Sequence, residues 1–323
     1  MSIIKTHDVT LYGSSGNFDI VLHPLCDENL PLLYKWNADP EVLYWSEGDD
    51  VIEGYDTETI NDIYGGVSQN AFCFLVEANN KPIGECWLQK MNMPEVIKQY
   101  PAQDVRRIDM IIGEKEYWGK GIGSAFISML IDLAFFGEYI DVLHCFTYDN
   151  NIRSLKAFLK NGFKEVKRIP TTNSSKHKEE IHLALTRQQF IEHHRTKVSS
   201  DKIFELPIDE IQPSQLYISD GKLKLVHDWF IPSDKSVFDP IPVKLYNNNY
   251  LMTDGHTRIV AAVLAGWETV PVTWDDDPLD MLAYALCVDW CNEAGIKNAT
   301  DLTKRIISFK EYETLWRKRC QNM

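Results

Sequence analysis

The sequence has no apolar run near the ~18 residues that a helix needs to cross a bilayer, which argues against a membrane-spanning segment. Residues 1–11 also lack the basic start and apolar stretch of a secretory signal. The seven cysteines are an odd number and lie mostly inside apolar runs, as is typical of buried free thiols in a reducing compartment. We therefore expect a cytoplasmic protein that does not bind membranes.

Metal-ligand spacings are scarce as well. Cys287 and Cys291 stand four apart in a helix-like stretch, but no second pair of Cys or His residues lies near them. Structural zinc sites need four such ligands, so the sequence predicts no metal site.

Basic residues are in deficit: 33 Lys and Arg face 47 Asp and Glu, for a formal net charge of −14. Nucleic-acid binding relies on Lys and Arg to neutralise phosphates, so this balance argues against a nucleic-acid partner. An acidic surface attracts a cationic amine, although it is also a common route to solubility.

The length of 323 residues is too great for one typical domain and suggests two. We find no internal repeat and no low-complexity tract. The polar segment 192–201 is the expected boundary. We predict a first domain over residues 1–190, a linker over 191–202 and a second domain over 203–323.

Strand-like and helical patterns alternate in the first part. They predict strands at 20–22, 72–78, 83–89, 107–112, 142–146 and 180–186, with a hairpin turn at 79–82, and helices at 124–136 and 152–161. Asp27 is expected to cap an earlier helix that carries Leu30 and Leu33. This order predicts an α/β (α+β) fold, a mixed sheet with flanking helices.

The sharpest motif joins the strand 107–112 to the helix that follows, through glycines at 119, 121 and 123. Glycines let main-chain N–H groups turn toward one point, and a helix N-terminus adds partial positive charge there. Such a turn suits a diphosphate like that of coenzyme A. The Rossmann and P-loop patterns are not met, and a glycine turn without a ligand is the alternative.

This turn resembles the Arg/Gln-x-x-Gly-x-Gly/Ala loop of the GNAT N-acetyltransferases, with Trp118 at the Arg/Gln place. Residues 151–163 are similar to the Asn-x-x-Ala-x-x-x-Tyr-x-x-x-Gly-Phe motif of that family. The resemblance implies acetyl-CoA as cofactor and a GNAT mixed sheet. The residues that it implies around the coenzyme are Met110, Ile112, Trp118, Gly119, Lys120, Gly121, Ile122, Gly123, Ser124 and Asn151.

Within this family, residues 19–186 are similar to aminoglycoside 6'-N-acetyltransferases, through segments 33–43, 80–84, 108–109 and 117–123. That likeness implies that the acceptor is a small amine, for example one like an aminoglycoside. It also implies that Asp109 is a base or a carboxylate that orients the substrate. A structural ion pair of Asp109 with Arg106 or Arg107 is the alternative.

The family often has a general-acid tyrosine where this chain has Phe158, which cannot donate a proton. Three alternatives follow. The thiolate leaves unassisted, given a thiol pKa near ~8.5; Tyr148 takes the role; or the domain is catalytically weak. Asn151 is expected to bind the pantetheine arm, to cap its own helix, or both.

Aromatic and acidic side chains together suit a cationic substrate. We expect them to line the acceptor pocket from two directions, with Trp36, Tyr44, Trp45 and Asp49 on one side and Glu95, Tyr100 and Asp104 on the other. Each aromatic has a core position as its alternative.

In the second part, the pattern predicts strands at 203–211, 242–246, 250–253 and 268–272, a hairpin turn at 247–249, a helix at 259–264 and a helical tail from 280, in which residues 316–319 form a solvated helix end. A strand-to-helix corner carries Asp254, Gly255, His256, Thr257 and Arg258. Phosphate is suited to such a corner, which combines an open glycine turn, the N-terminus of a helix and an arginine guanidinium.

This corner, with the Ala-Ala and Val-Pro-Val that follow it, resembles the ParB/sulfiredoxin-like fold over about residues 204–274. The resemblance implies a smaller α+β domain that binds ATP, ADP or another nucleotide, with Mg, at those five residues. One branch of this fold phosphorylates serine with a glutamate near its opening motif, and this chain has Ser214 near that place, which argues against kinase activity. No cysteine lies at the corner for sulfiredoxin chemistry. The alternative is a purely structural Arg258–Asp254 pair.

Together these patterns predict an acetyltransferase of a small amine fused to a nucleotide-binding module. The alternatives are a regulatory protein that binds both ligands without turnover and a serine-like kinase activity in the second domain. The sequence leaves the oligomeric state open.

Overall fold

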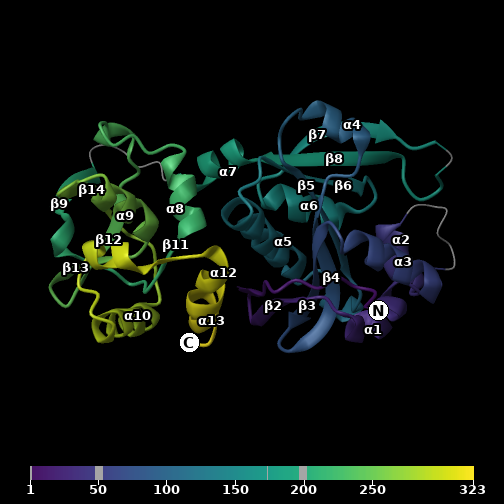
Figure 1. Ribbon diagram of the computed structural model, residues 1–323, viewed down its shortest axis with the longest axis horizontal. Coiled ribbons are helices and arrows are strands. Elements are labelled where there is room, and N and C mark those ends of the chain that lie inside the picture. The colour runs from purple at the N-terminus through teal and green to yellow at the C-terminus, as the bar shows by residue number, and fades with distance from the viewer. Residues whose placement is uncertain (1, 48–53, 173, 196–201) are drawn as a thin grey trace. The chain divides into compact units, whose positions relative to one another are not determined.

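The computed structural model describes residues 2–47, 54–172, 174–195 and 202–323 (Figure 1). The chain divides into two compact units, Met1–Phe190 and Ile191–Met323, which are treated separately below. Helix α7 (Arg187–His194) includes residues on both sides of this division, so the first residues of the predicted linker, 191–194, are helical. Within the described residues, no helix is long and apolar enough to cross a membrane. Predicted residue Asp49 lies outside the described residues.

The first unit is built on an eight-stranded sheet of order β1-β2-β3-β4-β5-β6-β8-β7, in which only the β5–β6 pair is parallel. The predicted mixed sheet is therefore confirmed. Its strands are β1 (Leu11–Ser15), β2 (Phe18–Pro24), β3 (Ala71–Ala78), β4 (Lys81–Lys90), β5 (Val105–Ile112), β6 (Val142–Tyr148), β7 (Lys164–Pro170) and β8 (Glu179–Thr186).

Helices flank this sheet, and Figure 1 shows α5 on one side of the strands and α2 with α3 on the other. Besides α7, the helices are α1 (Leu30–Trp36), α2 (Pro40–Ser46), α3 (Thr57–Val67), α4 (Pro94–Gln99), α5 (Ile122–Asp132) and α6 (Ile152–Lys160). Short turns of 3-10 helix, η1 (Asp27–Asn29) and η2 (Lys115–Tyr117), precede α1 and α5, and a π-helical turn, η3 (Leu133–Gly137), extends α5.

Two local expectations have opposite outcomes. The β3–β4 hairpin is confirmed, because Asn79 and Asn80 take positive φ angles of 48° and 62°, as a tight hairpin turn of this hand requires. Asp27 does not cap α1. Its carboxylate instead accepts hydrogen bonds from the main-chain N–H groups of Ile3 and Ile4, at 3.0 and 2.8 Å, and so ties the N-terminal segment to the unit.

Strands β5 and β6 separate soon after they meet. Their parallel register covers only Val105–Arg107 against 142–144, whereas β4 stays paired with β5 as far as Ile112 and β6 stays paired with β8 as far as Tyr148. Within the described residues, β5 beyond Arg107 thus has a partner strand on one edge alone. The diverging strands open the sheet where the glycine turn follows.

The second unit has a five-stranded mixed sheet of order β10-β13-β12-β14-β9 and a separate two-stranded pair, β11–β15. Its strands are β9 (Ile203–Pro207), β10 (Ile211–Gln212), β11 (Ile218–Ser219), β12 (Ile241–Tyr246), β13 (Asn249–Met252), β14 (Thr269–Trp274) and β15 (Ile306–Ile307). Its α-helices are α8 (Asp220–His227), α9 (His256–Leu264), α10 (Met281–Glu293), α11 (Ala299–Leu302), α12 (Phe309–Tyr312) and α13 (Lys318–Gln321).

The tail corrects one expectation about the second unit. Residues 316–319 read as a solvated helix end, yet Trp316 is buried and packs edge-on against Trp290, with ring centroids 6.3 Å apart. The tail therefore belongs to the core of this unit.

Gly84 offers a test of how tightly β4 and β5 pack. A Cβ at this position would lie 2.1 Å from the Ile111 carbonyl oxygen and 2.9 Å from the Ile112 Cα, both of them backbone atoms. We expect Gly84→Ala to destabilise the first unit by about 1–3 kcal/mol in urea unfolding, because backbone cannot move aside as a side chain can.

Gly66 is the matched control, since it is exposed on α3 and its added Cβ would meet nothing within 4 Å. Gly66→Ala should be neutral or should stabilise by up to about 1 kcal/mol, through helix propensity. Equal stabilities of the Gly84→Ala variant and the wild type would contradict the packing described.

Candidate active site

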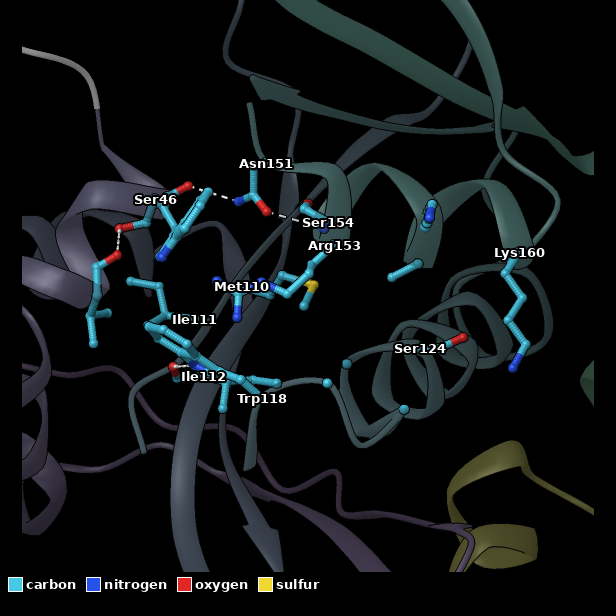
Figure 2. Close-up of a pocket in the computed structure, with 17 residues that line it drawn as sticks. Ser46, Met110, Ile111, Ile112, Trp118, Ser124, Asn151, Arg153, Ser154 and Lys160 are labelled. Carbon is cyan, nitrogen blue, oxygen red and sulfur yellow. Dashed lines mark hydrogen bonds between the residues drawn. The ribbon is translucent and has the colours of Figure 1, made fainter. Parts of the chain in front are cut away.

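A cavity of about 330 Å³ lies where the end of β5, the glycine turn and α6 face one another (Figure 2). Its lining residues are Val42, Trp45, Ser46, Met110, Ile111, Ile112, Trp118, Gly119, Gly121, Gly123, Ser124, Asn151, Arg153, Ser154, Lys156, Ala157 and Lys160. Most of the residues predicted to surround a coenzyme therefore meet at one cavity. The exceptions are Lys120, whose ammonium lies over the rings of Phe18 and Tyr117, and Ile122, which is fully buried.

The glycine turn has the conformation that the motif predicts. Gly119 and Gly121 take φ angles of 75° and 80°, in the region that side chains disfavour, and Gly121 is the N-cap of α5 without a side-chain cap. Gly121, Gly123 and Ser124 at the start of α5 line the cavity. The first turn of a helix carries N–H groups without intrahelical partners and partial positive charge, so this end of the cavity favours an anion. Gly123 leaves room for Met110, since an added Cβ would lie 3.3 Å from its Cε.

The side chains that line the cavity are uneven in charge. Three of them are cationic, Arg153, Lys156 and Lys160, and none is acidic, although the chain as a whole carries a net charge of −14. Opposite charges within a few ångströms favour binding, so this cavity is suited to a polyanion. These three cations are not among the site residues expected from the sequence, although their spacing of three and four residues on a predicted helix indicates a common face.

Trp118 does more than occupy the family's Arg/Gln place. Its indole N–H donates to the carbonyl oxygen of Ile112 at 2.7 Å, which ties the glycine turn to the end of β5 (Figure 2). The Arg153 guanidinium lies between two tryptophan rings, 4.7 Å from the centroid of Trp45 and 4.5 Å from that of Trp118. This stack connects α2, the glycine turn and α6 around the cavity.

Asn151 caps α6, as the sequence analysis allowed: its side-chain oxygen accepts from the Ser154 N–H at 3.2 Å. Its amide group donates to the carbonyl oxygen of Trp45 at 2.8 Å. Both ends of this side chain are thus engaged within the protein while it lines the cavity.

Residues 19–164 match the family model described as acetyltransferase (GNAT) domain. The first unit contains a GNAT acetyltransferase domain. The predicted enzyme class, an N-acetyltransferase, is thereby confirmed for this unit.

Curated relatives are distant. The aminoglycoside N(6')-acetyltransferases type 1 of Klebsiella pneumoniae and Serratia marcescens are each 20% identical over 193 residues, which cover 56% of this chain and 91% of theirs. Among solved structures, an aminoglycoside acetyltransferase with ribostamycin and coenzyme A matches at 19% identity and a TM-score of 0.43, over 55% of this chain and 99% of that one. The spermidine N-acetyltransferase of Vibrio cholerae, with CoA and spermine, matches at 15% identity and a TM-score of 0.45, over 53% and 98%.

Asp109, the predicted base of the GNAT domain, lies on β5 next to the stretch that lines the cavity. Its carboxylate accepts from the Arg107 Nε at 2.6 Å, so the predicted ion pair is present and its partner is Arg107. Burial raises the pKa of Asp109 although Arg107 lowers it. Across the strand pair, β4 places Glu85 on the same face; this carboxyl is buried, its Oε2 has no hydrogen-bond partner within the described residues, and burial raises its pKa well above the usual range.

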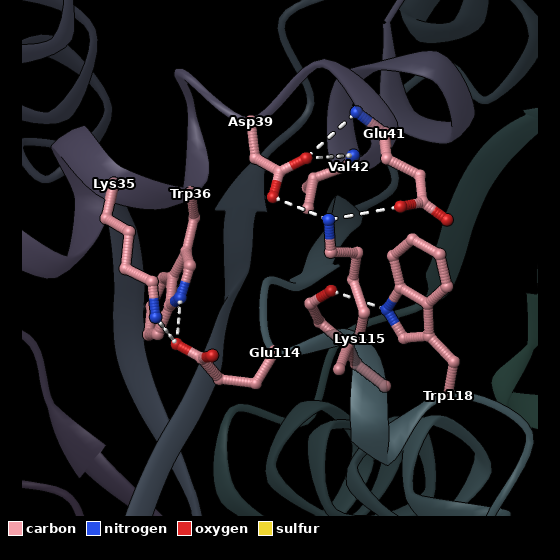
Figure 3. A network of polar contacts seen from close by, with 9 residues as sticks. Lys35, Trp36, Asp39, Glu41, Val42, Glu114, Lys115 and Trp118 are labelled. Carbon is pink, nitrogen blue, oxygen red and sulfur yellow. Dashed lines mark hydrogen bonds and ion pairs between the residues drawn. The ribbon is translucent and has the colours of Figure 1, made fainter.

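Two predicted acceptor-site residues lie elsewhere. Trp36 is buried in the core, 1% exposed, and its indole N–H donates to Glu114 at 2.8 Å (Figure 3). Asp104 precedes β5, and its carboxylate accepts two hydrogen bonds from the Arg106 guanidinium, from Nε at 2.6 Å and from Nη2 at 2.9 Å. Four strand residues lie between it and Asp109, so the five residue steps span about 17 Å at strand spacing.

Of the remaining predicted residues, Trp45 and Tyr44 lie at or next to the cavity, whereas Glu95 and Tyr100 belong to α4 and its C-cap. Trp45 lines the cavity, and Tyr44 is exposed and packs edge-on against Trp45. Tyr148 ends β6 and stacks on His177, with ring centroids 3.8 Å apart. Phe158, at the family's tyrosine place, is buried against Phe163, 5.2 Å between centroids.

The predicted nucleotide corner of the second unit has the expected backbone: Gly255 takes a φ of 84° as the N-cap of α9. Its side chains are engaged, however. Arg258 pairs with Asp254 at 3.2 Å and with Asp239 at 3.9 Å, and the His256 Nε2 accepts from the Ser214 N–H at 3.1 Å. Burial lowers the pKa of His256 to about 4, so Arg258 is the cation of the corner and His256 is neutral near pH 7.

Proposed function

We propose that the first unit transfers an acetyl group from acetyl-CoA to a small amine. The observation that carries this is the acid-free cavity with three cations, which adjoins both the glycine turn and the open edge of β5. A diphosphate suits the turn and the start of α5, and an extended arm suits the strand edge. The bound coenzyme supplies the acetyl thioester.

The residues then have distinct tasks. The amine nitrogen forms a bond to the thioester carbonyl carbon, and Asp109 accepts the proton that the nitrogen gives up, directly or through water. Main-chain N–H groups on the free edge of β5 stabilise the negative charge on the carbonyl oxygen. The carbon–sulfur bond breaks, and the thiolate leaves unassisted or takes a proton from Tyr148.

The acceptor is a small cationic amine in this proposal. The curated relatives are aminoglycoside acetyltransferases, and one similar structure is a spermidine acetyltransferase, so both kinds of amine are candidates. The charge of −14 favours the approach of such a cation, and Asp109 and Glu85 lie on one face of the β4–β5 pair, beside the stretch of β5 that lines the cavity.

For the second unit we propose a phosphate site for ATP, ADP or another nucleotide, with Mg, at residues Asp254, Gly255, His256, Thr257 and Arg258. The support is the left-handed Gly255 at the start of α9 and the buried guanidinium behind it. Binding requires Arg258 to exchange part of its pairing with Asp254 for the phosphate.

Replacing Gly121 tests the coenzyme site. In Gly121→Val a branched side chain meets a φ of 80° and occupies the turn, so we expect CoA affinity to fall at least about tenfold in calorimetry. Gly16→Val is the control, because Gly16 has a φ of 57°, no neighbour within 4 Å of an added Cβ, and no place in the cavity. If Gly121→Val binds CoA as the wild type does, the turn is not the site.

Replacing Asp109 tests the base. Asp109→Asn should lower kcat by about a hundredfold or more while CoA affinity stays unchanged, in a thiol-release assay over a panel of aminoglycosides and polyamines. Asp104→Asn is the matched control, since it alters a second Asp–Arg pair next to the same strand.

The same assay distinguishes an enzyme from a regulatory protein that binds its ligands without turnover. Phe158 favours this second alternative, because phenylalanine cannot act as a general acid. Wild-type turnover with an amine, lost in Asp109→Asn and kept in Asp104→Asn, supports the enzyme. Tight CoA binding with no thiol release for any amine supports the regulatory protein. In the wild type, activity should fall as pH decreases through the raised pKa of Asp109, because only the carboxylate accepts a proton.

The nucleotide proposal is tested by titrating MgATP and MgADP into the full chain. We expect saturable heat that weakens severalfold in Thr257→Val, which removes a hydroxyl from the first turn of α9. The absence of binding in the wild type would leave the corner a structural one, held by Arg258 and its two carboxylates.

A further inference from the structure

Helix α6 presents a row of cations to the coenzyme cavity (Figure 2). Arg153, Lys156 and Lys160 are spaced by three and four residues, so they lie along one face of the helix. All three line the cavity, and the face contributes no carboxylate to it.

The two lysines differ from other cations of the first unit. Lys35 pairs with Glu114, Lys115 with Asp39 and Glu41, and Arg107 with Asp109. For Lys156 and Lys160, by contrast, no ion pair or hydrogen bond forms with any residue in the described part of the chain. A cluster of unpaired like charges on a helix is unfavourable by itself, so it favours an anionic ligand.

Arg153, unlike the two lysines, is held in place by aromatic side chains. Its guanidinium is held between Trp45 and Trp118, with 4.7 and 4.5 Å to the ring centroids. The flexible ammonium groups of Lys156 and Lys160 are therefore the mobile cations of this wall.

The end of α6 lies beside the start of α5. Asn161, directly after Lys160, donates from its amide to the Ser124 carbonyl oxygen at 3.1 Å and to the Ser124 hydroxyl at 2.9 Å. Lys160 is thus anchored close to the glycine turn, on the opposite wall of the cavity. The turn and the α5 N-terminus already provide main-chain donors for a diphosphate, and the lysines provide charge for a second anionic group.

Resting on the proposed use of acetyl-CoA, we propose that Lys156 and Lys160 form a subsite for the ribose 3'-phosphate of the coenzyme. This terminal phosphate is a dianion near neutral pH, and flexible point charges suit it better than a rigid cradle does. The subsite makes the enzyme select coenzyme A over its dephospho form.

The experiment compares CoA with dephospho-CoA by calorimetry on the full chain. We expect the wild type to bind CoA about tenfold more tightly, the sum of two partly exposed charge pairs. Lys156→Gln/Lys160→Gln should bind the two ligands equally, with its affinity for dephospho-CoA close to that of the wild type. Lys164→Gln, an exposed lysine on β7 outside the cavity, should keep the wild-type preference.

The outcomes distinguish a failure of the 3'-phosphate subsite from a failure of the proposed acetyl-CoA function. Equal wild-type affinities for both ligands, or a preference that survives in the double variant, overturn the subsite. A double variant that loses affinity for both ligands in equal proportion also overturns it, and assigns the lysines to the diphosphate. If neither ligand binds the wild type, the proposed acetyl-CoA function fails instead.

Discussion

The first unit depends on the separation of β5 from β6 after only three paired residues. β5 stays fixed by β4, and β6 stays fixed by β8, so the sheet opens without losing either strand. The separation leaves one edge of β5 without a strand partner just before the glycine turn and gives α6 a cavity to face. In a closed sheet the same residues would pair with each other, and neither an arm-binding edge nor a cavity would exist.

Charge is distributed to keep that cavity positive in an acidic chain. Three carboxylates on α2, at its N-cap and just after β5 are paired with their own partners: Glu114 with Lys35 and the Trp36 indole, and Asp39 and Glu41 with Lys115 (Figure 3). These contacts also fasten α1 and α2 to the segment that follows β5. Exposed ion pairs contribute little to stability individually, so their larger effect here is to neutralise acidic groups beside an anion site.

Local chemistry explains which parts of the site the sequence could predict. Positive φ at Gly119 and Gly121, the Asn79–Asn80 turn and the Asn151 cap each depend on a few neighbouring residues, and all have the expected geometry. The position of Trp36 depends on long-range packing instead: the same indole could line a pocket or fill the core, and it fills the core. Trp118 is similar, because its bond to the Ile112 carbonyl requires the strand and the turn to be folded together. The α6 cations were visible as a spacing, but their common cavity arises only when α6 faces the turn.

The most direct test of the account is hydrogen–deuterium exchange of the full chain with and without acetyl-CoA. If the open edge of β5 and the glycine turn receive the coenzyme, main-chain exchange slows in peptides that cover residues 108–113 and 119–124. Unchanged exchange in both segments at saturating acetyl-CoA, with protection confined to other parts of the chain, would contradict the account.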